Sequence, residues 1–169
     1  MKNIIWFDRK FVFDLAPEMF PLVVERLRGT PARLEEITGG LSPGVLTYRV
    51  GTSWTIMENA GHLLDLEPLW NGRVDDFFAG EKRLRAADLK NTKTHEASHN
   101  AASLAELLRS FRAEREKMVA RFDAMDVREI VLTALHPRLD QPMRMIDLAF
   151  FVAEHDDHHL ACITRLIRV

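Results

Sequence analysis

Residues 154–160 read EHDDHHL and lie between two mostly apolar segments, MIDLAFFVA at 145–153 and ACITRLI at 161–167. Apolar residues recur at helical spacing from 145 to 167, which predicts a long helix. On a helical wheel of about 100° per residue, His159 lies about 40° from His155. The same stripe of the helix carries Leu148, Phe151 and Leu166. The two histidines are therefore predicted to lie in the middle of a buried helix face.

A buried pair of imidazoles one turn apart needs partners for its ring nitrogens, because an unpartnered polar group in a core is costly. Two interpretations account for His155 and His159. Each ring could be hydrogen-bonded to a carbonyl or carboxylate in the core. Alternatively, both rings could bind one divalent metal ion, which the i, i+4 spacing on a helix permits. The pattern of this one helix leaves both interpretations open.

A metal site in a helical bundle takes its remaining ligands from facing helices. His62 is the candidate for a third ligand, because it lies among apolar residues in the helix predicted at 55–78. His95 and His99 lie in a polar linker, and His136 precedes a proline. These three histidines are expected in loops or at the surface. Three histidine ligands would leave coordination positions open to water or substrate, as in catalytic sites.

Glu58 lies one turn before His62 and also has two interpretations. Thr55 and Glu58 have the spacing of a capping box, in which the glutamate serves the start of a helix. The same carboxylate could instead act at the site, as a fourth ligand, as a hydrogen-bond acceptor behind a ligand, or as a catalytic base.

Hydrophobic spacing and helix-end signals predict four long helices. We expect them at 17–38, 55–78, 101–125 and 145–167. The first is expected to break at Gly29 and restart with Thr30 as its cap, and the second to kink at Pro68. Residues 4–13 are predicted to form an extended arm, and 41–52 a long loop. Four helices without convincing strands indicate an antiparallel four-helix bundle in a single domain over 1–169.

Composition limits the class of protein. The 169 residues carry a formal net charge of −2, which gives no general attraction to nucleic acid. No apolar run has the roughly 18 residues needed to span a bilayer. The N-terminal residues do not form a secretory signal, and the one cysteine, Cys162, excludes a disulfide framework. We expect a cytoplasmic protein without nucleic-acid or membrane partners.

Three motifs taken together resemble the DinB-like superfamily. They are Trp54-Thr55, His62-Leu63 and His155-Asp156-x-His158-His159-Leu160. The resemblance implies a four-helix bundle of the DinB/YfiT-like type, commonly dimeric, with a divalent ion bound by three histidines. Carried over by position, the ligands are His62, His155 and His159, and His158 does not ligate. Zinc or nickel is expected first, then iron or manganese. One departure is Cys162, which stands where a glutamine is frequent in the family.

The resemblance also implies a class of reaction. Characterised relatives include low-molecular-weight-thiol S-transferases and a thiol-dependent isomerase. We therefore expect a metal-dependent transferase of the detoxification type that activates a thiol and acts on a small molecule. A metal-dependent hydrolase is the near alternative, and a non-catalytic metal-binding or stress-associated protein is the alternative of another class. A thiol would need a polar recess, for which Arg49, Arg73 and Arg144 are candidates.

The first segment suggests how the protein assembles. Four aromatic residues lie within it, namely Trp6, Phe7, Phe11 and Phe13. A terminal arm this apolar is expected to pack against its own bundle or against a second chain. We expect a homodimer.

Overall fold

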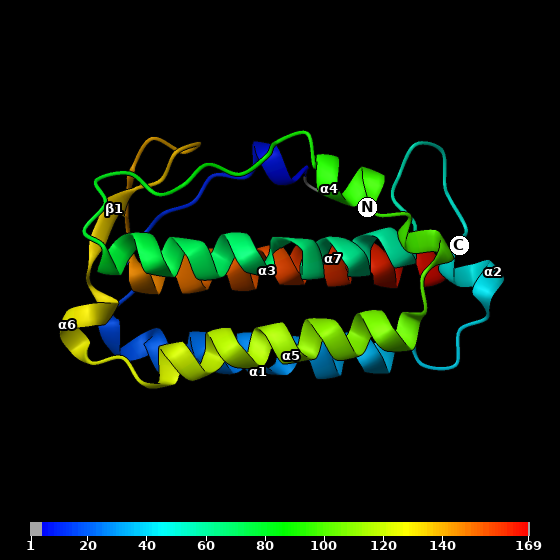
Figure 1. Ribbon diagram of the computed structural model, residues 1–169, viewed down its shortest axis with the longest axis horizontal. Helices are drawn as coiled ribbons and strands as arrows, with labels where there is room; N and C mark the ends of the chain where they lie inside the picture. The colour runs from blue at the N-terminus through cyan, green and yellow to red at the C-terminus, as the bar shows by residue number, and fades with distance from the viewer. Residues whose placement is uncertain (1–4, 169) are drawn as a thin grey trace.

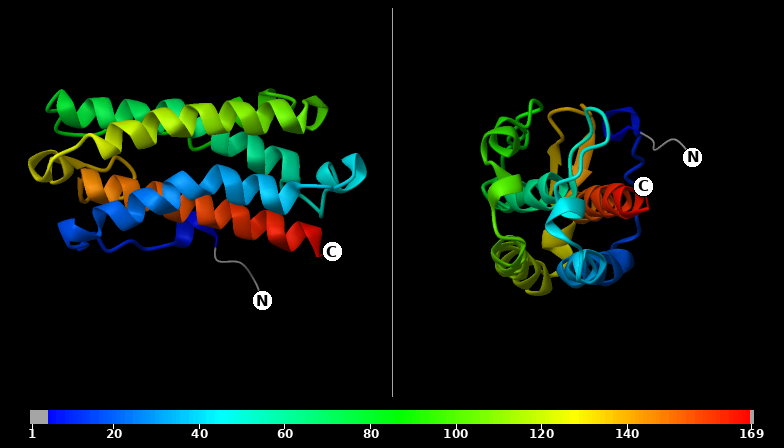
Figure 2. Two further views of the ribbon diagram at one scale, coloured as in Figure 1. Left: turned by 90° about the horizontal axis from the view of Figure 1, so that it is seen from below. Right: turned by 90° about the vertical axis from the view of Figure 1, so that its right-hand side faces the viewer.

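Four long helices form the body of the protein in the computed structural model, which describes residues 5–168. They are α1 (Phe20–Thr38), α3 (Ile56–Phe78), α5 (Leu104–Asp123) and α7 (Met145–Ile167). Helix α1 contacts α5 and α7, and α3 contacts the same two helices. Viewed along the axis, the four helices therefore stand at the corners of a square (Figure 2). The predicted four-helix bundle is confirmed.

The direction of the helices explains the connections between them. In Figure 1, α1 and α7 run one way, whereas α3 and α5 run the opposite way. Because α3 and α5 are parallel neighbours, the chain between them must return along the length of the bundle. This crossover, residues 79–103, lies along the outer face of the α3/α7 layer (Figure 1). It carries α4 (Thr92–Glu96) and the 3₁₀ turn η3 (His99–Ala101).

The remaining elements are short. The 3₁₀ turns η1 and η2 span Trp6–Asp8 and Pro17–Met19, and α2 and α6 span Pro43–Leu46 and Val127–Ile130. Strands β1 (Thr133–Leu135) and β2 (Pro142–Arg144) pair antiparallel, with Thr133 opposite Arg144. This hairpin was not predicted from the sequence. Among the described residues, none of the helices combines the length and apolarity that crossing a bilayer would require.

Helix α1 corrects one prediction, because it runs unbroken through Gly29 and Pro31. Thr30 is not a cap; its hydroxyl donates to Asp156 Oδ2 of α7 at 2.8 Å. Pro31 has no N–H for the carbonyl of Leu27. That carbonyl instead faces Nη1 of Arg115 on α5, at 3.5 Å. Contacts from two other helices therefore hold a segment whose local sequence favours a break.

The ends of the other long helices agree with the predictions to within three residues. The capping box of Thr55 and Glu58 opens α3 as predicted. Helix α3 was expected to kink at Pro68, and it continues through this residue as one helix. Helix α5 begins three residues later than predicted, after Ser103, whose hydroxyl accepts the N–H of Glu106.

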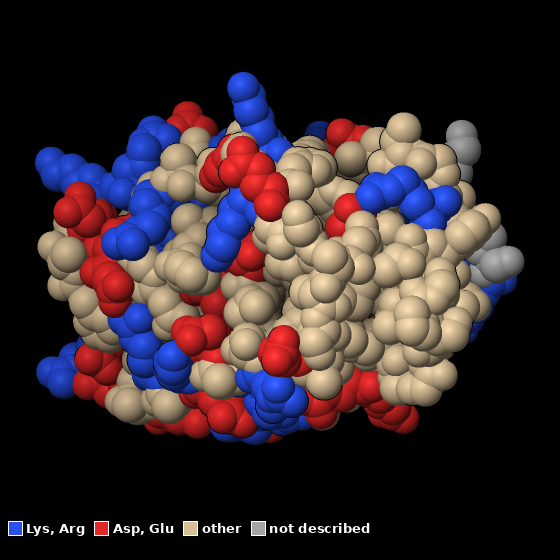
Figure 3. Space-filling view, turned by 45° about the vertical axis from the view of Figure 1, so that its right-hand side comes forward, with Lys and Arg blue, Asp and Glu red and all other residues tan. Residues whose placement is uncertain are grey.

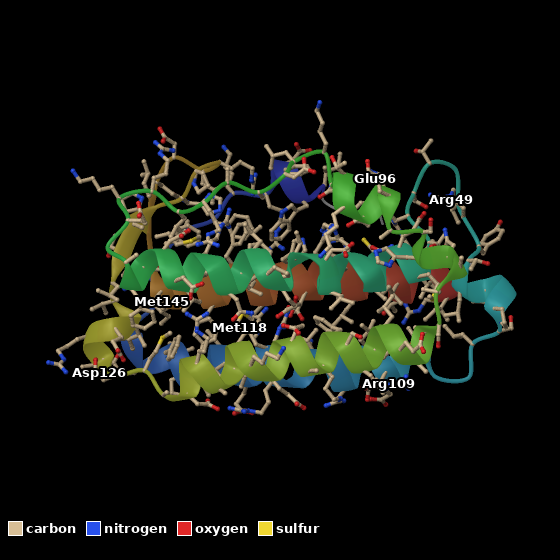
Figure 4. All side chains as sticks on the ribbon, in the orientation of Figure 1. Arg49, Glu96, Arg109, Met118, Asp126 and Met145 are labelled. Carbon is tan, nitrogen blue, oxygen red and sulfur yellow. The ribbon has the colours of Figure 1, made fainter. Side chains whose placement is uncertain are left out.

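The N-terminal arm packs on its own bundle. The ring centroids of Trp6 and Phe11 lie 5.1 Å and 4.9 Å from that of Phe151 on α7. Side chains project into two spaces in Figure 4. One space lies between the two helix layers, where Met118 is labelled. The other lies between the α3/α7 layer and the segments that cover it.

A buried ionic cluster joins the helices at mid-bundle. Arg115 of α5 is 1% exposed, and both Glu67 of α3 and Asp156 of α7 are fully buried. The guanidinium donates to Glu67 Oε1 at 2.6 Å, and it also binds both oxygens of Asp156. Burial raises the pKa of Glu67, while the two carboxylates raise the pKa of Arg115 against the opposing effect of its own burial. Each charge is stable here only because the others are present.

We expect Arg115→Met to lower the free energy of unfolding by about 3–5 kcal/mol, because it leaves two buried carboxylates without their cation. The measurement is equilibrium denaturation in urea. The matched control is Arg112→Met, on the same helix, whose pair with Glu35 is solvent-exposed. That substitution should cost about 1 kcal/mol or less. Equal losses in the two variants would contradict a special role for the buried cluster.

Candidate metal centre

Three histidines converge on the outer face of the α3/α7 layer. His62 comes from α3, and His155 and His159 come from successive turns of α7. One ring nitrogen from each residue lies within 4.8 Å of the other two. The ring centroids are 4.5 Å apart for the α7 pair, and His62 lies 4.8 Å from His159 and 5.3 Å from His155. All three residues are buried. The structure therefore brings together the three histidines that the sequence singled out.

The orientation of His159 is set by Asn59 on α3. The amide nitrogen of Asn59 donates to the carbonyl of Thr55 at 2.7 Å, which turns the amide oxygen toward the imidazole. That oxygen lies 2.9 Å from Nδ1 of His159. The proton of the neutral ring is therefore assigned to Nδ1, and Nε2 keeps its lone pair for a ligand.

The crossover segment sets the orientation of His62. Nδ1 of His62 lies 3.0 Å from the hydroxyl of Thr94, which itself donates to Asp65 Oδ2 at 2.9 Å. Because the hydroxyl proton goes to Asp65, the oxygen accepts the Nδ1–H of His62. His99 completes the chain, with Nε2 2.8 Å from Asp65 Oδ2. Gly61 permits this approach, since a Cβ there would lie 2.4 Å from the His99 ring.

His155 has the least complete set of hydrogen bonds. Its Nε2 lies 3.2 Å from Nε2 of His159, and its buried Nδ1 has no hydrogen-bond partner. Two nitrogens on a tetrahedral zinc ion would be about 3.3 Å apart, given Zn–N bonds of 2.0–2.1 Å. The spacing of the two Nε2 atoms therefore fits a shared ion.

The protonation state of the cluster also fits a metal. Burial lowers the pKa of His62 to about 4, and it lowers the pKa of His155 and of His159 well below the ordinary value. The rings are therefore neutral near pH 7. Metal ions bind the neutral imidazole, so these side chains are in the form that a ligand requires.

A cavity of about 530 Å³ opens beside the histidines. Its walls include all three tryptophans of the chain, Trp6, Trp54 and Trp70. Trp54 lies 4.6 Å from His62 between ring centroids, and Trp6 lies 5.0 Å from His155. This volume falls within the range of small-molecule sites, about 300–1,000 Å³. On the face shown in Figure 3, acidic and basic side chains are interspersed, so that face has no basic stripe of the kind that binds nucleic acid.

The other predicted residues near the site have different positions. His158 is half-buried, with Nε2 3.9 Å from Sγ of Cys162, and it is not part of the three-histidine group. Cys162 lines the cavity. Glu58 does not line it; its carboxylate accepts from the N–H of Thr55 and binds Arg49 and Asn100. A catalytic role for Glu58 stays a prediction, and these contacts favour the capping role.

The remaining histidines were expected in loops or at the surface, and this holds for His95, which is exposed, and for His136, which lies in the loop after β1, but not for His99. Both His99 and His136 are buried. His99 is buried because it binds Asp65 across Gly61, and His136 because its ring packs on Phe151 with centroids 5.1 Å apart. Arg73 lines the cavity as proposed, while Arg144 binds Asp147 at the start of α7.

Sequence reasoning missed Asn59, Asp65 and Thr94. Asn59 and Asp65 share α3 with His62, and polar residues on an otherwise apolar helix face are a usable signal. Thr94 carried no such signal, because its contact depends on how the crossover folds back over α3.

Fold and site together define a four-helix-bundle protein with a three-histidine cluster beside a cavity. The chain belongs to the DinB superfamily, whose family model matches residues 26–163. A comparison with curated protein sequences gives no match. Among solved structures, YfiT from Bacillus subtilis is similar, with a TM-score of 0.82 and 20% sequence identity over 95% of this chain and 92% of YfiT. YfiT is described as a probable metal-dependent hydrolase with an unusual four-helix bundle topology. At this identity the likeness shows the fold.

Replacing His155 with alanine should abolish stoichiometric metal binding, because two remaining imidazoles hold an ion weakly. Replacing the adjacent His158 should leave close to one ion per chain. The measurement is elemental analysis of protein purified without a histidine tag, after incubation with zinc or nickel and removal of excess metal. Equal losses in the two variants would contradict the ligand set.

Proposed function

We propose that this protein is a metal-dependent enzyme acting on a small molecule, with a divalent ion bound by His62, His155 and His159. One observation carries the proposal: three neutral imidazoles converge at the wall of a cavity large enough for a substrate. A storage or structural metal site would instead be closed off by a further protein ligand. Among the described residues, the histidine cluster includes no fourth cysteine, carboxylate or histidine.

A bound divalent ion would supply an acidified water or thiol and would polarise a substrate oxygen. The protein's own part is to hold and orient the ligands. Asn59 holds the Nδ1 proton of His159, and Thr94 does the same for His62. Partners of this kind, placed behind metal ligands, typically change affinity or activity by about 10- to 100-fold. The nitrogens that face the cavity are thereby kept unprotonated.

The aromatic walls of the cavity shield the histidines and offer an apolar surface. Trp54 stacks beside His159 with centroids 5.9 Å apart, and Trp70 meets the edge of His155 at 5.6 Å. These rings limit the access of bulk water to the histidines. They also provide an apolar surface for the body of a substrate.

Two reactions are consistent with this site. Thiol S-transfer is the form that we place first, because the cavity has room for a small thiol beside an acceptor. Metal-dependent hydrolysis is the second candidate, and the likeness to YfiT favours it. Three imidazole ligands suit zinc, nickel and iron, so the donor set leaves the choice among these metals to experiment.

The two reactions can be separated by assaying the metal-loaded protein. We expect conjugation of a small thiol to 1-chloro-2,4-dinitrobenzene, and we expect this activity to disappear in His155→Ala and after chelation. If p-nitrophenyl acetate is hydrolysed without thiol, and with the same metal dependence, the hydrolase is the better assignment. If the protein holds one ion per chain and catalyses neither reaction, a non-catalytic metal-binding role is favoured.

Glu58→Gln tests the remaining sequence hypothesis. A general base contributes about 10²–10⁴-fold to turnover, so its loss would be obvious in the same assay. Because the carboxylate of Glu58 is held by Thr55, Arg49 and Asn100, we expect turnover and metal content to stay unchanged. A fall in turnover with metal retained would return Glu58 to the catalytic site.

A further inference from the structure

A second group of polar side chains lines the same cavity, away from the metal centre. It consists of Arg73 on α3, with His136 and Arg138 in the turn after β1. Arg73 and His62 are eleven residues apart on α3, about 16 Å of helix rise. Phe151 and Trp70 lie between the two groups, since Phe151 contacts His136 and Trp70 contacts His155.

Arg73 is a buried cation, and no carboxylate of the described residues forms an ion pair with it. It is 2% exposed; its Nε donates to the carbonyl of Arg85 at 3.1 Å, and its guanidinium lies over Trp70 at 5.3 Å. The neighbouring acid, Asp76, is bound by Arg85 at 2.6 Å. Gly72 makes that pair possible, because a Cβ there would lie 2.0 Å from the Arg85 guanidinium. Burial lowers the pKa of Arg73 to about 10, so the side chain remains charged at pH 7.

Arg138 also lacks a hydrogen-bond acceptor for part of its guanidinium group. Its Nη2 atom is buried and has no hydrogen-bond partner, and its guanidinium lies 5.3 Å from the ring centroid of Phe7. Burial lowers the pKa of Arg138 as well. A buried donor of a charged group that lacks an acceptor is costly, so such atoms call for an explanation.

His136 adds a third donor. Its Nδ1 accepts the backbone N–H groups of Arg138 and Leu139, at 3.3 Å and 3.1 Å. A neutral ring with Nδ1 as acceptor carries its proton on Nε2. Nε2 lies 3.2 Å from Nη1 of Arg73, which can only donate. Two N–H groups therefore meet with no acceptor between them.

Within the described part of the chain, the two guanidiniums at this end of the cavity have no carboxylate in direct contact. Among residues 5–168, no ion pair joins Arg73 or Arg138 to a carboxylate. Asp88 also lines the cavity, but its oxygens accept the backbone N–H groups of Lys90 and Thr92. The donors of Arg73, His136 and Arg138 therefore favour a negatively charged group.

We propose that Arg73, His136 and Arg138 form an oxyanion subsite, which binds the carboxylate or phosphate group of a small amphiphilic substrate. Guanidinium groups match the geometry of both oxyanions. The apolar body of the substrate lies along Phe151 and Trp70, and its reacting end lies at the three histidines. This assignment of the reacting end rests on the proposed function, whereas the subsite itself rests on its own residues.

The test compares hexanoate and hexyl phosphate with the neutral hexanamide, which has the same apolar chain. Binding is followed by tryptophan fluorescence, because all three tryptophans line the cavity and none of these ligands absorbs near 280 nm. Metal-loaded protein should bind at least one of the anions at least about 10-fold more tightly than the amide, since hydrogen bonds to charged groups are the stronger class. Arg138→Gln should lower anion affinity by roughly 10-fold or more and leave amide affinity unchanged.

Two further variants keep the result interpretable. Arg83→Gln is the control, because Arg83 is exposed, pairs with Asp140 and does not line the cavity; it should bind all three ligands as the wild type does. Arg73→Gln is the more drastic substitution, since it alters a buried side chain, and a thermal melt shows whether it folds. Arg138 is half-buried, so Arg138→Gln remains a test if Arg73→Gln unfolds.

The outcomes separate this subsite from the metal centre. Anion binding that persists in EDTA and depends on Arg138 supports the subsite, even if the metal proposal fails. Anion binding that disappears in EDTA and in His155→Ala, but is unchanged in Arg138→Gln, places the anion on the metal and overturns the subsite. Equal affinity for anion and amide, or no binding of any of the three at millimolar concentration, also overturns it.

Discussion

The contact between Arg115 and the carboxylates of Glu67 and Asp156 is the constraint on which the rest of the structure depends. Asp156 directly follows His155, and its turn toward Arg115 fixes the rotation of α7 about its own axis. With that rotation set, His155 and His159 face away from α1 and α5, toward the outer side of the α3/α7 layer. Glu67 lies between His62 and Arg73 on α3 and fixes that helix in the same way. The buried Arg115 therefore orients the histidines of both α3 and α7 toward the same side of the bundle. The titratable groups at 154–160 thus face different partners: Glu154 and Asp157 bind arginines of the arm and α1, whereas Asp156 binds Arg115.

The order of the helices determines what covers the site. In a bundle with short connections throughout, the outer face of α3 and α7 would be open to solvent. Here α3 and α5 run in the same direction, so residues 79–103 must return along the bundle, over the outer face of the α3/α7 layer (Figure 1). That passage brings Thr94 to His62 and His99 to Asp65. The N-terminal arm covers the neighbouring stretch through Trp6 and Phe11. The cavity therefore lies between the outer face of α3 and α7 and covering segments with little secondary structure, which the order of the helices places there.

This architecture explains which features the sequence could predict. The helical period identified the stripe that holds His155 and His159, because a buried face is a property of one helix. His62 followed from its apolar neighbours in α3. The break at Gly29 was wrong because local helix signals take no account of Arg115, which serves the carbonyl left unbonded by Pro31. His99 was expected in a loop or at the surface but is buried in a 3₁₀ turn, since a linker gives no sign that it folds back over a bundle. Contacts between remote segments, such as Thr94 with His62, have no signature in the local pattern.

The two ends of the cavity differ in a way that follows from burial. At one end, desolvation makes the histidines neutral. Among the described residues, the cluster of possible metal ligands contains no carboxylate. Asp65 reaches His62 only indirectly, through the hydroxyl of Thr94. Three neutral ligands leave the charge of any divalent ion uncompensated by the protein. At the other end, no ion pair among residues 5–168 joins Arg73 or Arg138 to a carboxylate, and Asp76, near Arg73, is held by Arg85. Both ends therefore favour negative charge, and the aromatic residues between them favour an apolar body. The ligand that we propose for this cavity therefore carries an anionic group at the Arg73 end and an apolar body, and its reacting group lies at the histidines.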